Sequence, residues 1–241
     1  MLHKTRGIVF KTTDYAESSV IAQIFTEKFG LQSYLINGVK KPKSKIRTNM
    51  LQPLHLLDMV VYHKPAGNMQ RVAELRQLPV FHSIPYDVIK SSIVIFLNEI
   101  LYKAIRQQTA DDILFEFLYK SIELLDRVDG GLANFHLYFL LRLTKFLGFY
   151  PDRTTEGTND YFDLQNGAFL KYPPTHQLVL HQPYTTYWTQ LLKANFENLE
   201  NIQIPVTERR ILLNEIIHYY QLHIEGFGQI KSHRVLEDVL A

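Results

Sequence analysis

Residues 19–38 read SVIAQIFTEKFGLQSYLING, and this stretch decides the fold of the N-terminal third of the chain. Two short runs rich in β-branched and aromatic residues, 19–25 and 31–36, are separated by a turn that ends in Gly30. Glycine adopts positive φ without steric cost, and Asn37-Gly38 follows the second run as another turn signal. The stretch therefore predicts two short strands joined by a tight turn.

Three further β-rich runs surround this pair. Residues 6–12 precede it across a polar turn at 14–18, and residues 54–62 and 69–78 follow it, separated by a turn at 64–68. Five short strands in about 80 residues predict a small closed barrel, because closure removes exposed strand edges. An oligonucleotide-binding (OB) barrel has this size and strand count. An SH3-like barrel is the alternative, since counting strands does not separate the two.

After Pro85 the apolar residues recur at helical spacing. Asp87 is the expected N-cap of a first helix that reaches residue 105, and Asp111-Asp112 open a second that reaches residue 125. Further helices are expected at 132–147, 207–224 and 232–240, the first of them apolar around most of its circumference, as a central buried helix is. The fold class is therefore α+β, with an OB barrel over residues 1–80 and a mostly α-helical domain over residues 81–241.

The segment 151–183 differs in composition from the helices around it, being rich in Asp, Asn, Gly, Pro, Thr and Tyr. Asn166-Gly167 is a typical two-residue hairpin turn. We therefore expect a small β-hairpin insertion in the helical domain, held together by packing of Phe162, Leu164, Phe169 and Tyr172.

Composition excludes several classes of function. The chain has no cysteine, so it has no disulfide, thiolate metal site or thiol nucleophile. It contains no apolar run of the roughly 20 residues that a membrane span needs and no secretory signal, so we expect a cytoplasmic protein that does not enter membranes. Phosphate-binding and nucleophile-elbow motifs are missing, and its ten histidines are scattered. We expect no catalytic residue, metal or cofactor.

Charge is distributed unevenly along the chain. The net charge is +2, yet residues 1–80 carry +7 and the remainder carries −5. Such asymmetry indicates that the barrel faces a polyanion while the helical domain faces something else.

The densest charge is the basic loop, residues 40–47, which places five cations in eight residues. Mutual repulsion and Pro42 favour a mobile loop that a phosphate backbone would order; the alternative is a solubilising loop. The aromatic residues Phe10, Tyr15 and Tyr34 could stack on bases, but strand alternation does not decide which face outward. Tyr15 is preferred because it lies in a polar turn. The candidate nucleic-acid-binding residues are Lys11, Tyr15, Lys40, Lys41, Lys43, Lys45, Arg47 and Arg71.

Several motifs in order along the chain resemble the bacterial recombination-mediator family RecO. They are residues 6–18 (RGIVFKTTDYAES), 37–44 (NGVKKPKS), 51–54 (LQPL), 146–151 (FLGFYP) and 230–236 (IKSHRVL). The resemblance spans almost the whole chain. It implies an OB barrel followed by a helical domain with a small insertion, and a cytoplasmic, nucleoid-associated role in DNA repair of the RecF type.

The resemblance also implies an activity and partners. RecO proteins bind single- and double-stranded DNA, anneal complementary strands and assist recombinase loading on DNA coated with single-strand-binding protein. They partner RecR and the C-terminal tail of the single-strand-binding protein. By position the basic loop and Lys11 would contact DNA, and the predicted helix 132–147 with Arg142 and Lys145 would be a candidate groove for the tail.

One departure from the family concerns zinc. Many members carry a four-cysteine zinc module after the Leu-Gly-Phe/Tyr motif, but residues 152–174 contain no cysteine here, so the insertion lacks zinc ligands. Two other functions stay open at this point. An RNA-binding OB module on a helical scaffold would use the same basic barrel, as would a non-catalytic protein adaptor whose partner is acidic.

Overall fold

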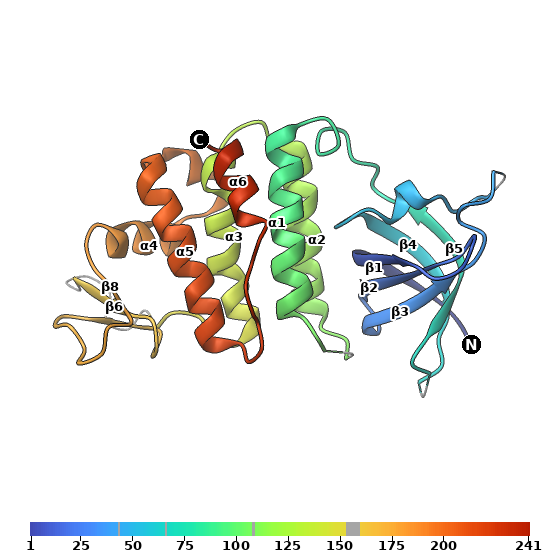
Figure 1. The fold of residues 1–241 in the computed structure, drawn as a ribbon, viewed down its shortest axis with the longest axis horizontal. Helices are drawn as coiled ribbons and strands as arrows, with labels where there is room; N and C mark the ends of the chain where they lie inside the picture. Colours follow the sequence, from blue (N-terminus) through green and yellow to red (C-terminus); the bar gives the residue numbers. More distant parts are fainter. Residues whose placement is uncertain (43, 66, 108, 153–159) are drawn as a thin grey trace. The chain divides into compact units, whose positions relative to one another are not determined.

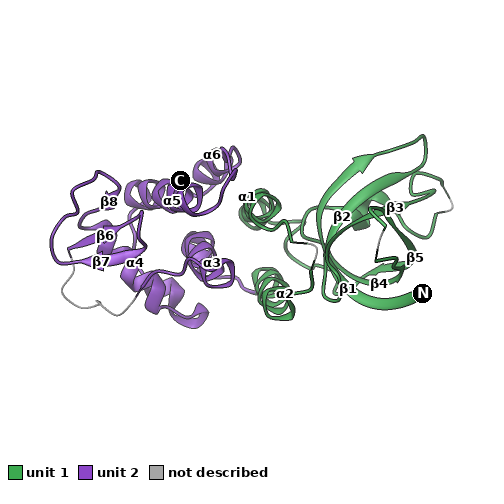
Figure 2. Ribbon diagram, turned by 90° about the horizontal axis from the view of Figure 1, so that it is seen from below, with its two compact units in different colours: residues 1–127 green, residues 128–241 purple. Residues whose placement is uncertain are grey.

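The computed structural model of the protein describes residues 1–42, 44–65, 67–107, 109–152 and 160–241. These residues form two compact units, 1–127 and 128–241 (Figure 2). The first holds a β-barrel and two helices, and the second holds the remaining helices and a small sheet. The predicted domain boundary between residues 80 and 81 lies at the end of the barrel, inside the first unit, and stays a prediction about folding domains.

The first unit begins with a closed barrel of five strands in the order β1-β2-β3-β5-β4 (Figure 1). The strands are β1 (Leu2–Asp14), β2 (Val20–Thr26), β3 (Gly30–Ile36), β4 (Leu56–Tyr62) and β5 (Gln70–Gln77). The first strand is longer than predicted because its N-terminal half pairs with β4 and its C-terminal half with β2. Parallel pairing of β3 with β5 closes the barrel. The predicted OB barrel is confirmed.

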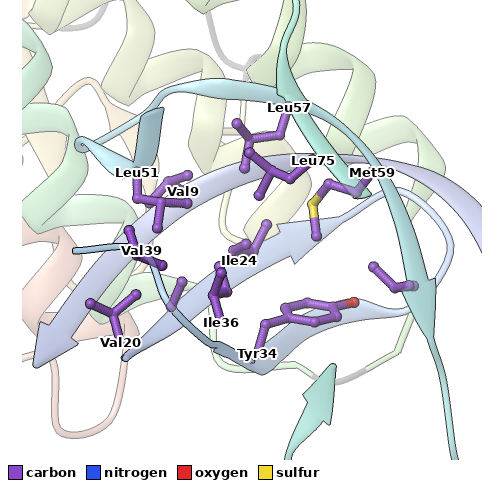
Figure 3. Close-up of a cluster of buried hydrophobic side chains, with 12 residues drawn as sticks. Val9, Val20, Ile24, Tyr34, Ile36, Val39, Leu51, Leu57, Met59 and Leu75 are labelled. Atoms are coloured by element: carbon purple, nitrogen blue, oxygen red, sulfur yellow. The ribbon is translucent and has the colours of Figure 1, made fainter. Parts of the chain in front are cut away.

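The barrel interior is filled by apolar side chains from every strand (Figure 3). The alternation of the strands supplies them, because residues two apart along a strand point to the same face. Tyr34 is one of these core residues and is fully buried. Each such side chain removed from water contributes about 1.5–3 kcal/mol. The fully or nearly fully buried cluster is Val9, Val20, Ala22, Ile24, Tyr34, Ile36, Val39, Leu51, Leu57, Met59, Val61 and Leu75.

The outer face of β1 and β2 is buried as well, against the helices α1 (Val88–Ala104) and α2 (Asp112–Arg127). The Phe10 ring stacks on Phe25 with centroids 5.8 Å apart, and Phe25 lies 6.0 Å from Phe115 of α2. At the other end of this contact, Gly30 has φ +63°, and a Cβ there would overlap the backbone of Thr109 in the connection between α1 and α2. The barrel and the helical pair therefore share a second apolar core.

An arginine at the edge of this second core joins the barrel to α2. The Arg6 guanidinium donates to Glu27 in the barrel and to Glu116 on α2, and it lies 4.8 Å from the centroid of the Tyr119 ring. The hydrogen bond to Glu27 raises the pKa of Arg6, burial opposes this, and the bond to Glu116 raises it further. The positive charge of Arg6 is thus paired with the carboxylates of Glu27 and Glu116 within the protein.

The connector between barrel and α1, residues 78–87, is held by one carboxylate. Asp126 at the end of α2 accepts hydrogen bonds from the backbone N–H groups of His82, Ser83 and Ile84, each at 2.9–3.1 Å. The buried Lys90 ammonium donates to the Ser83 hydroxyl at 2.7 Å and to the carbonyl of Asp126 at 3.1 Å. These bonds tie the connector to both helices of the unit.

The second unit is built around α3 (Leu132–Leu147), which is largely buried, as predicted. It packs against α4 (Tyr184–Lys193) and α5 (Val206–His223), and the chain ends with α6 (His233–Val239). The helix α4 and the 3-10 helix η2 (Phe196–Asn201) were not predicted. Thr and aromatic residues favour helices weakly, and α4 instead owes its place to the fully buried Trp188. Across the described ranges, no helix has the length and hydropathy of a membrane span.

The insertion forms a three-stranded sheet of β6 (Tyr161–Asp163), β7 (Ala168–Leu170) and β8 (Val179–Leu180), with the expected turn at Asn166-Gly167. Phe162, Leu164 and Phe169 are buried as predicted. The prediction for Tyr172 was wrong, since this residue is 73% exposed. Trp188 and Tyr219 pack against Phe162 in its place.

A carboxylate closes the hairpin turn of this sheet. Asp163 accepts from the backbone N–H groups of Gln165 and Asn166, and its second oxygen accepts from the Asn166 amide and lies 3.3 Å from His176. Asp163 and His176 contact each other, and these two side chains are fewer than the four ligands of a structural zinc site.

Removing the Asp126 carboxylate should destabilise the first unit. An Asp126→Ala variant leaves three backbone N–H donors without this partner, that of the buried Ile84 among them, which should cost about 2 kcal/mol in the free energy of unfolding measured with urea. Asp238→Ala, an exposed carboxylate on α6, is the control. Equal stability of Asp126→Ala and wild type would contradict the assigned role.

The same interaction predicts a pH dependence. Burial would raise the pKa of Asp126, but the N–H groups of Ile84, His82 and Ser83 outweigh burial and lower it. A carboxyl with a depressed folded pKa stabilises above its unfolded value of about 3.9, and the stabilisation is lost as pH falls through the folded pKa. The difference in the free energy of unfolding between wild type and Asp126→Ala should be largest near pH 6 and should decrease below about pH 4.

Candidate nucleic-acid interface

Two loops meet where β1, β2 and β3 end. The β1–β2 turn, residues 15–19, joins the first two strands, and the basic loop, residues 40–47, follows β3 and leads to the 3-10 helix η1 (Thr48–Leu51). In Figure 1 the basic loop projects from one end of the barrel, away from α1 and α2 of the same unit. This end carries most of the residues predicted to bind nucleic acid.

The basic loop is anchored on both sides. Val39 before it is 3% exposed and belongs to the barrel core, and Ile46 and Met50 pack against the same core. Within the loop, Ser44 donates its N–H to the Lys41 carbonyl and its hydroxyl to the Ile46 carbonyl. The apolar residues on both sides of the loop therefore pack against the barrel core. The mobility that the charge pattern predicted stays a prediction.

Lys40 is already ion-paired. Its ammonium nitrogen lies 2.9 Å from Oδ1 of Asp14, the last residue of β1. Its backbone N–H donates to the Ser18 carbonyl at 3.4 Å, and Ser19 Oγ lies 3.2 Å from Asn37 Oδ1. The basic loop is thus fastened to the β1–β2 turn. The sequence carried no signal for this pairing, since Asp14 and Lys40 lie 26 positions apart.

The other described cations of the loop point into solvent. Lys41, Lys45 and Arg47 are exposed, and none of them forms an ion pair with any residue that the structure describes. Lys43 lies outside the described residues. Unpaired exposed cations gathered on one loop can contact phosphates without first breaking an internal bond.

Only one of the three candidate aromatic residues is available for stacking. Tyr15 is 60% exposed in the β1–β2 turn, beside the pair of Asp14 and Lys40. Phe10 and Tyr34 are buried, in the second apolar core and in the barrel core respectively. The exposed ring is therefore that of Tyr15, which was preferred because it lies in a polar turn, and the other two residues belong to the cores.

Lys11 lies on the strand that leads to this turn and is exposed. Its ammonium group contacts Tyr102 of α1, 3.4 Å from the hydroxyl and 5.0 Å from the ring centroid. Such cation–π contacts hold a lysine weakly when they are exposed. Sequence reasoning did not identify Tyr102, because only the fold brings α1 next to β1.

Arg71 lies at the start of β5, where it pairs in register with Leu35 near the end of β3 and with Tyr62 of β4. With Tyr62, Lys64, Met69 and Gln70 it lines an open hollow. Figure 1 shows the hairpin of β4 and β5 pointing to the opposite side from the basic loop. The grouping of Arg71 with the loop stays a prediction. The exposed Tyr62 and Lys64 beside Arg71 were not predicted.

In the second unit, Arg142 and Lys145 both lie on α3. Arg142 is half-buried, donates to the Ala194 carbonyl at 2.5 Å and lies over the Tyr138 ring. Lys145 is exposed near the end of the helix. Of the two, Lys145 is the cation that a ligand can reach without displacing an internal bond.

The arrangement suits binding of a polyanion. Across the described ranges, no three histidine or carboxylate side chains converge as they would around a metal ion. The barrel end presents the exposed cations Lys41, Lys45 and Arg47 on the basic loop, and the exposed Tyr15 on the β1–β2 turn to which the loop is fastened. Cations on such a surface neutralise backbone phosphates, and a ring stacks on an unpaired base.

Comparisons with known proteins cover the whole chain. Residues 1–81 match the family model described as "Recombination protein O N terminal", and residues 85–234 match "Recombination protein O C terminal". The chain is 38% identical to the "DNA repair protein RecO" of Flavobacterium psychrophilum and 36% identical to that of Azobacteroides pseudotrichonymphae, each over 99% of both chains. It is 34% identical to the protein of that name from Phocaeicola vulgatus, over the full length of both.

Proposed function

Since this chain belongs to the RecO family, we propose that it serves DNA repair as a DNA-binding recombination mediator without a catalytic centre. In this role it binds single- and double-stranded DNA, anneals complementary strands and assists recombinase loading on DNA coated with single-strand-binding protein. The family's part in DNA repair is the established premise, and the binding and annealing steps are the proposal.

The observation that carries the proposal is the composition of the barrel end. Lys41, Lys45 and Arg47 are exposed and unpaired among the described residues, and Tyr15 is exposed beside them. An OB barrel that presents cations and a ring in this way has the two elements of single-strand binding: charge for the backbone and a platform for a base.

The same chemistry supports strand annealing. Contacts to phosphates hold a strand without engaging its base edges, so a bound strand keeps its hydrogen-bonding groups for a complementary strand. Neutralising phosphates also reduces the repulsion between two strands that approach each other. Neither step consumes a nucleotide or needs a metal ion.

Partner binding follows from family membership. We propose RecR as one partner and the acidic, apolar C-terminal tail of the single-strand-binding protein as another, with α3 and its cations Arg142 and Lys145 as the candidate surface for the tail. A protein of this kind works in the bacterial cytoplasm, on the nucleoid.

Two alternatives are separated by simple binding assays. An RNA-binding module would prefer RNA over DNA of the same sequence, because contacts to the 2′-hydroxyl distinguish the two. A pure protein adaptor would bind neither oligonucleotide even at low salt. We expect DNA to compete at least as well as RNA.

Replacing the loop cations tests the proposed interface. The variant Lys40→Ala/Lys41→Ala/Lys45→Ala/Arg47→Ala should lose most of its affinity for single-stranded DNA and anneal complementary strands more slowly, because its phosphate contacts are gone. The plot of log affinity against log salt concentration should flatten by about 2–3 units, since each phosphate contact contributes about 0.7. Fluorescence anisotropy at several salt concentrations measures both quantities.

The matched control removes four exposed cations outside the barrel, at Lys120, Arg127, Lys171 and Arg234. It changes the net charge by the same amount and should keep the wild-type salt dependence. If both variants lost affinity equally, net charge and not the loop would govern binding.

Tyr15 should contribute to binding of unpaired bases. Tyr15→Ala should weaken binding of single-stranded DNA by about 1–3 kcal/mol, because one stacked base loses its platform, and should affect duplex DNA less. Tyr172→Ala, which removes another largely exposed ring, is the control. An equal effect of Tyr15→Ala on both kinds of DNA would argue against stacking.

The partner surface on α3 has its own test. Lys145→Glu should slow annealing of strands coated with the cognate single-strand-binding protein, because an acidic tail is repelled, and should leave annealing of bare strands unchanged. Lys171→Glu is the control for charge reversal. Slower annealing of bare strands by Lys145→Glu would place this residue in DNA binding instead.

A further inference from the structure

One cation of the basic loop, Lys40, forms an ion pair with a carboxylate of the protein itself. Lys40 is paired with Asp14 at 2.9 Å, whereas Lys41, Lys45 and Arg47 have no acidic partner within the described ranges. Asp14 directly precedes the exposed Tyr15 in the chain, so the pair adjoins the turn from which a DNA strand would pass to the loop if the proposed function holds. The carboxylate therefore occupies a position that a phosphate would also favour.

We propose that Asp14 is a built-in competitor for the phosphate backbone, which holds Lys40 neutralised until DNA displaces it. This inference rests on the proposed DNA-binding function and adds to it a residue that weakens and regulates binding at the same site. Binding at Lys40 is then an exchange of one anion for another. The other described cations of the loop, Lys41, Lys45 and Arg47, bind phosphates without such an exchange.

Solvent exposure of both side chains of the Asp14–Lys40 pair makes this exchange feasible. The Asp14 side chain is 75% exposed and that of Lys40 is 36% exposed, so neither group is trapped when the pair opens. Exposed ion pairs contribute little to stability, so a phosphate can replace the carboxylate at small cost. Asp58, a barrel carboxylate that contacts two cations, is different: its side chain is only 12% exposed, lies 3.8 Å from Lys4 and accepts from Arg76 at 2.5 and 3.0 Å. Asp58 fits a structural ion pair, and Asp14 fits a replaceable one.

The position of Lys40 does not depend on the charge of Asp14. The backbone N–H of Lys40 is bonded to the Ser18 carbonyl, and the neighbouring Val39 is buried in the barrel core. An Asp14→Asn substitution also keeps the Oδ1 acceptor that the lysine contacts. The substitution thus removes one negative charge while leaving the turn and the loop in place. A positioning role for the charge would instead make this variant bind more weakly.

The experiment measures affinity for a single-stranded oligonucleotide as a function of salt. Asp14→Asn should bind about two- to five-fold more tightly than wild type at low salt, the range expected when an exposed ion pair no longer competes. Its salt dependence should steepen by about 0.7 in the slope of the log–log plot, because one more phosphate contact releases counterions. Glu17→Gln is the matched control, since Glu17 is an exposed acid of the same turn without an ion pair in the described structure.

A double-mutant cycle with Lys40→Gln identifies the cation involved. In the wild-type background Lys40→Gln should cost little affinity, and in the Asp14→Asn background it should remove the whole gain. The effects of Lys40→Gln and Glu17→Gln on affinity should be additive, because Lys40 and Glu17 share no contact. An unchanged or weaker affinity of Asp14→Asn would overturn the proposal, as would a gain that survives in Asp14→Asn/Lys40→Gln. Failure of the wild-type protein to bind DNA at low salt would instead remove the proposed function itself.

Discussion

The two-sided burial of β1 and β2 is the constraint on which the first unit depends. The inward residues of these strands, Val9 and Ile24 among them, fill the barrel. On the outer face Phe10 stacks on Phe25, and Phe25 packs against Phe115 of α2. A strand pair covered on both faces has no freedom to change register, since a slip of one residue would exchange the two sets of side chains. Arg6, paired with Glu27 and Glu116, fixes the same contact at its rim.

This constraint leaves the ends of the strands as the free surface. Where β1, β2 and β3 emerge from the two cores, the chain carries Asp14, Tyr15 and the basic loop. Val39 and Ile46 anchor the loop to the barrel core, while Lys41, Lys45 and Arg47 are exposed to solvent. Exposed cations on an anchored loop suit a ligand whose backbone is regular and whose sequence varies. Nucleic acid is such a ligand.

Aromatic packing and a capped turn hold the small sheet of the second unit together. Phe162 contacts both Phe169 and Trp188 in a buried aromatic cluster, and the Asp163 carboxylate accepts hydrogen bonds within the turn. The cysteine-free insertion is therefore cross-linked by side-chain packing and hydrogen bonds.

The sequence alone determined the five strands, the closed barrel, the principal helices and the concentration of charge in residues 40–47, because alternation, helical periodicity and charge are local properties of the chain. It also favoured Tyr15 correctly as the exposed ring. Tertiary structure decided the rest: that Phe10 and Tyr34 are core residues, that α4 forms around Trp188, and that Asp14 neutralises Lys40. Each of these depends on contacts between residues distant in sequence, and no local pattern encodes which partner the fold will bring near.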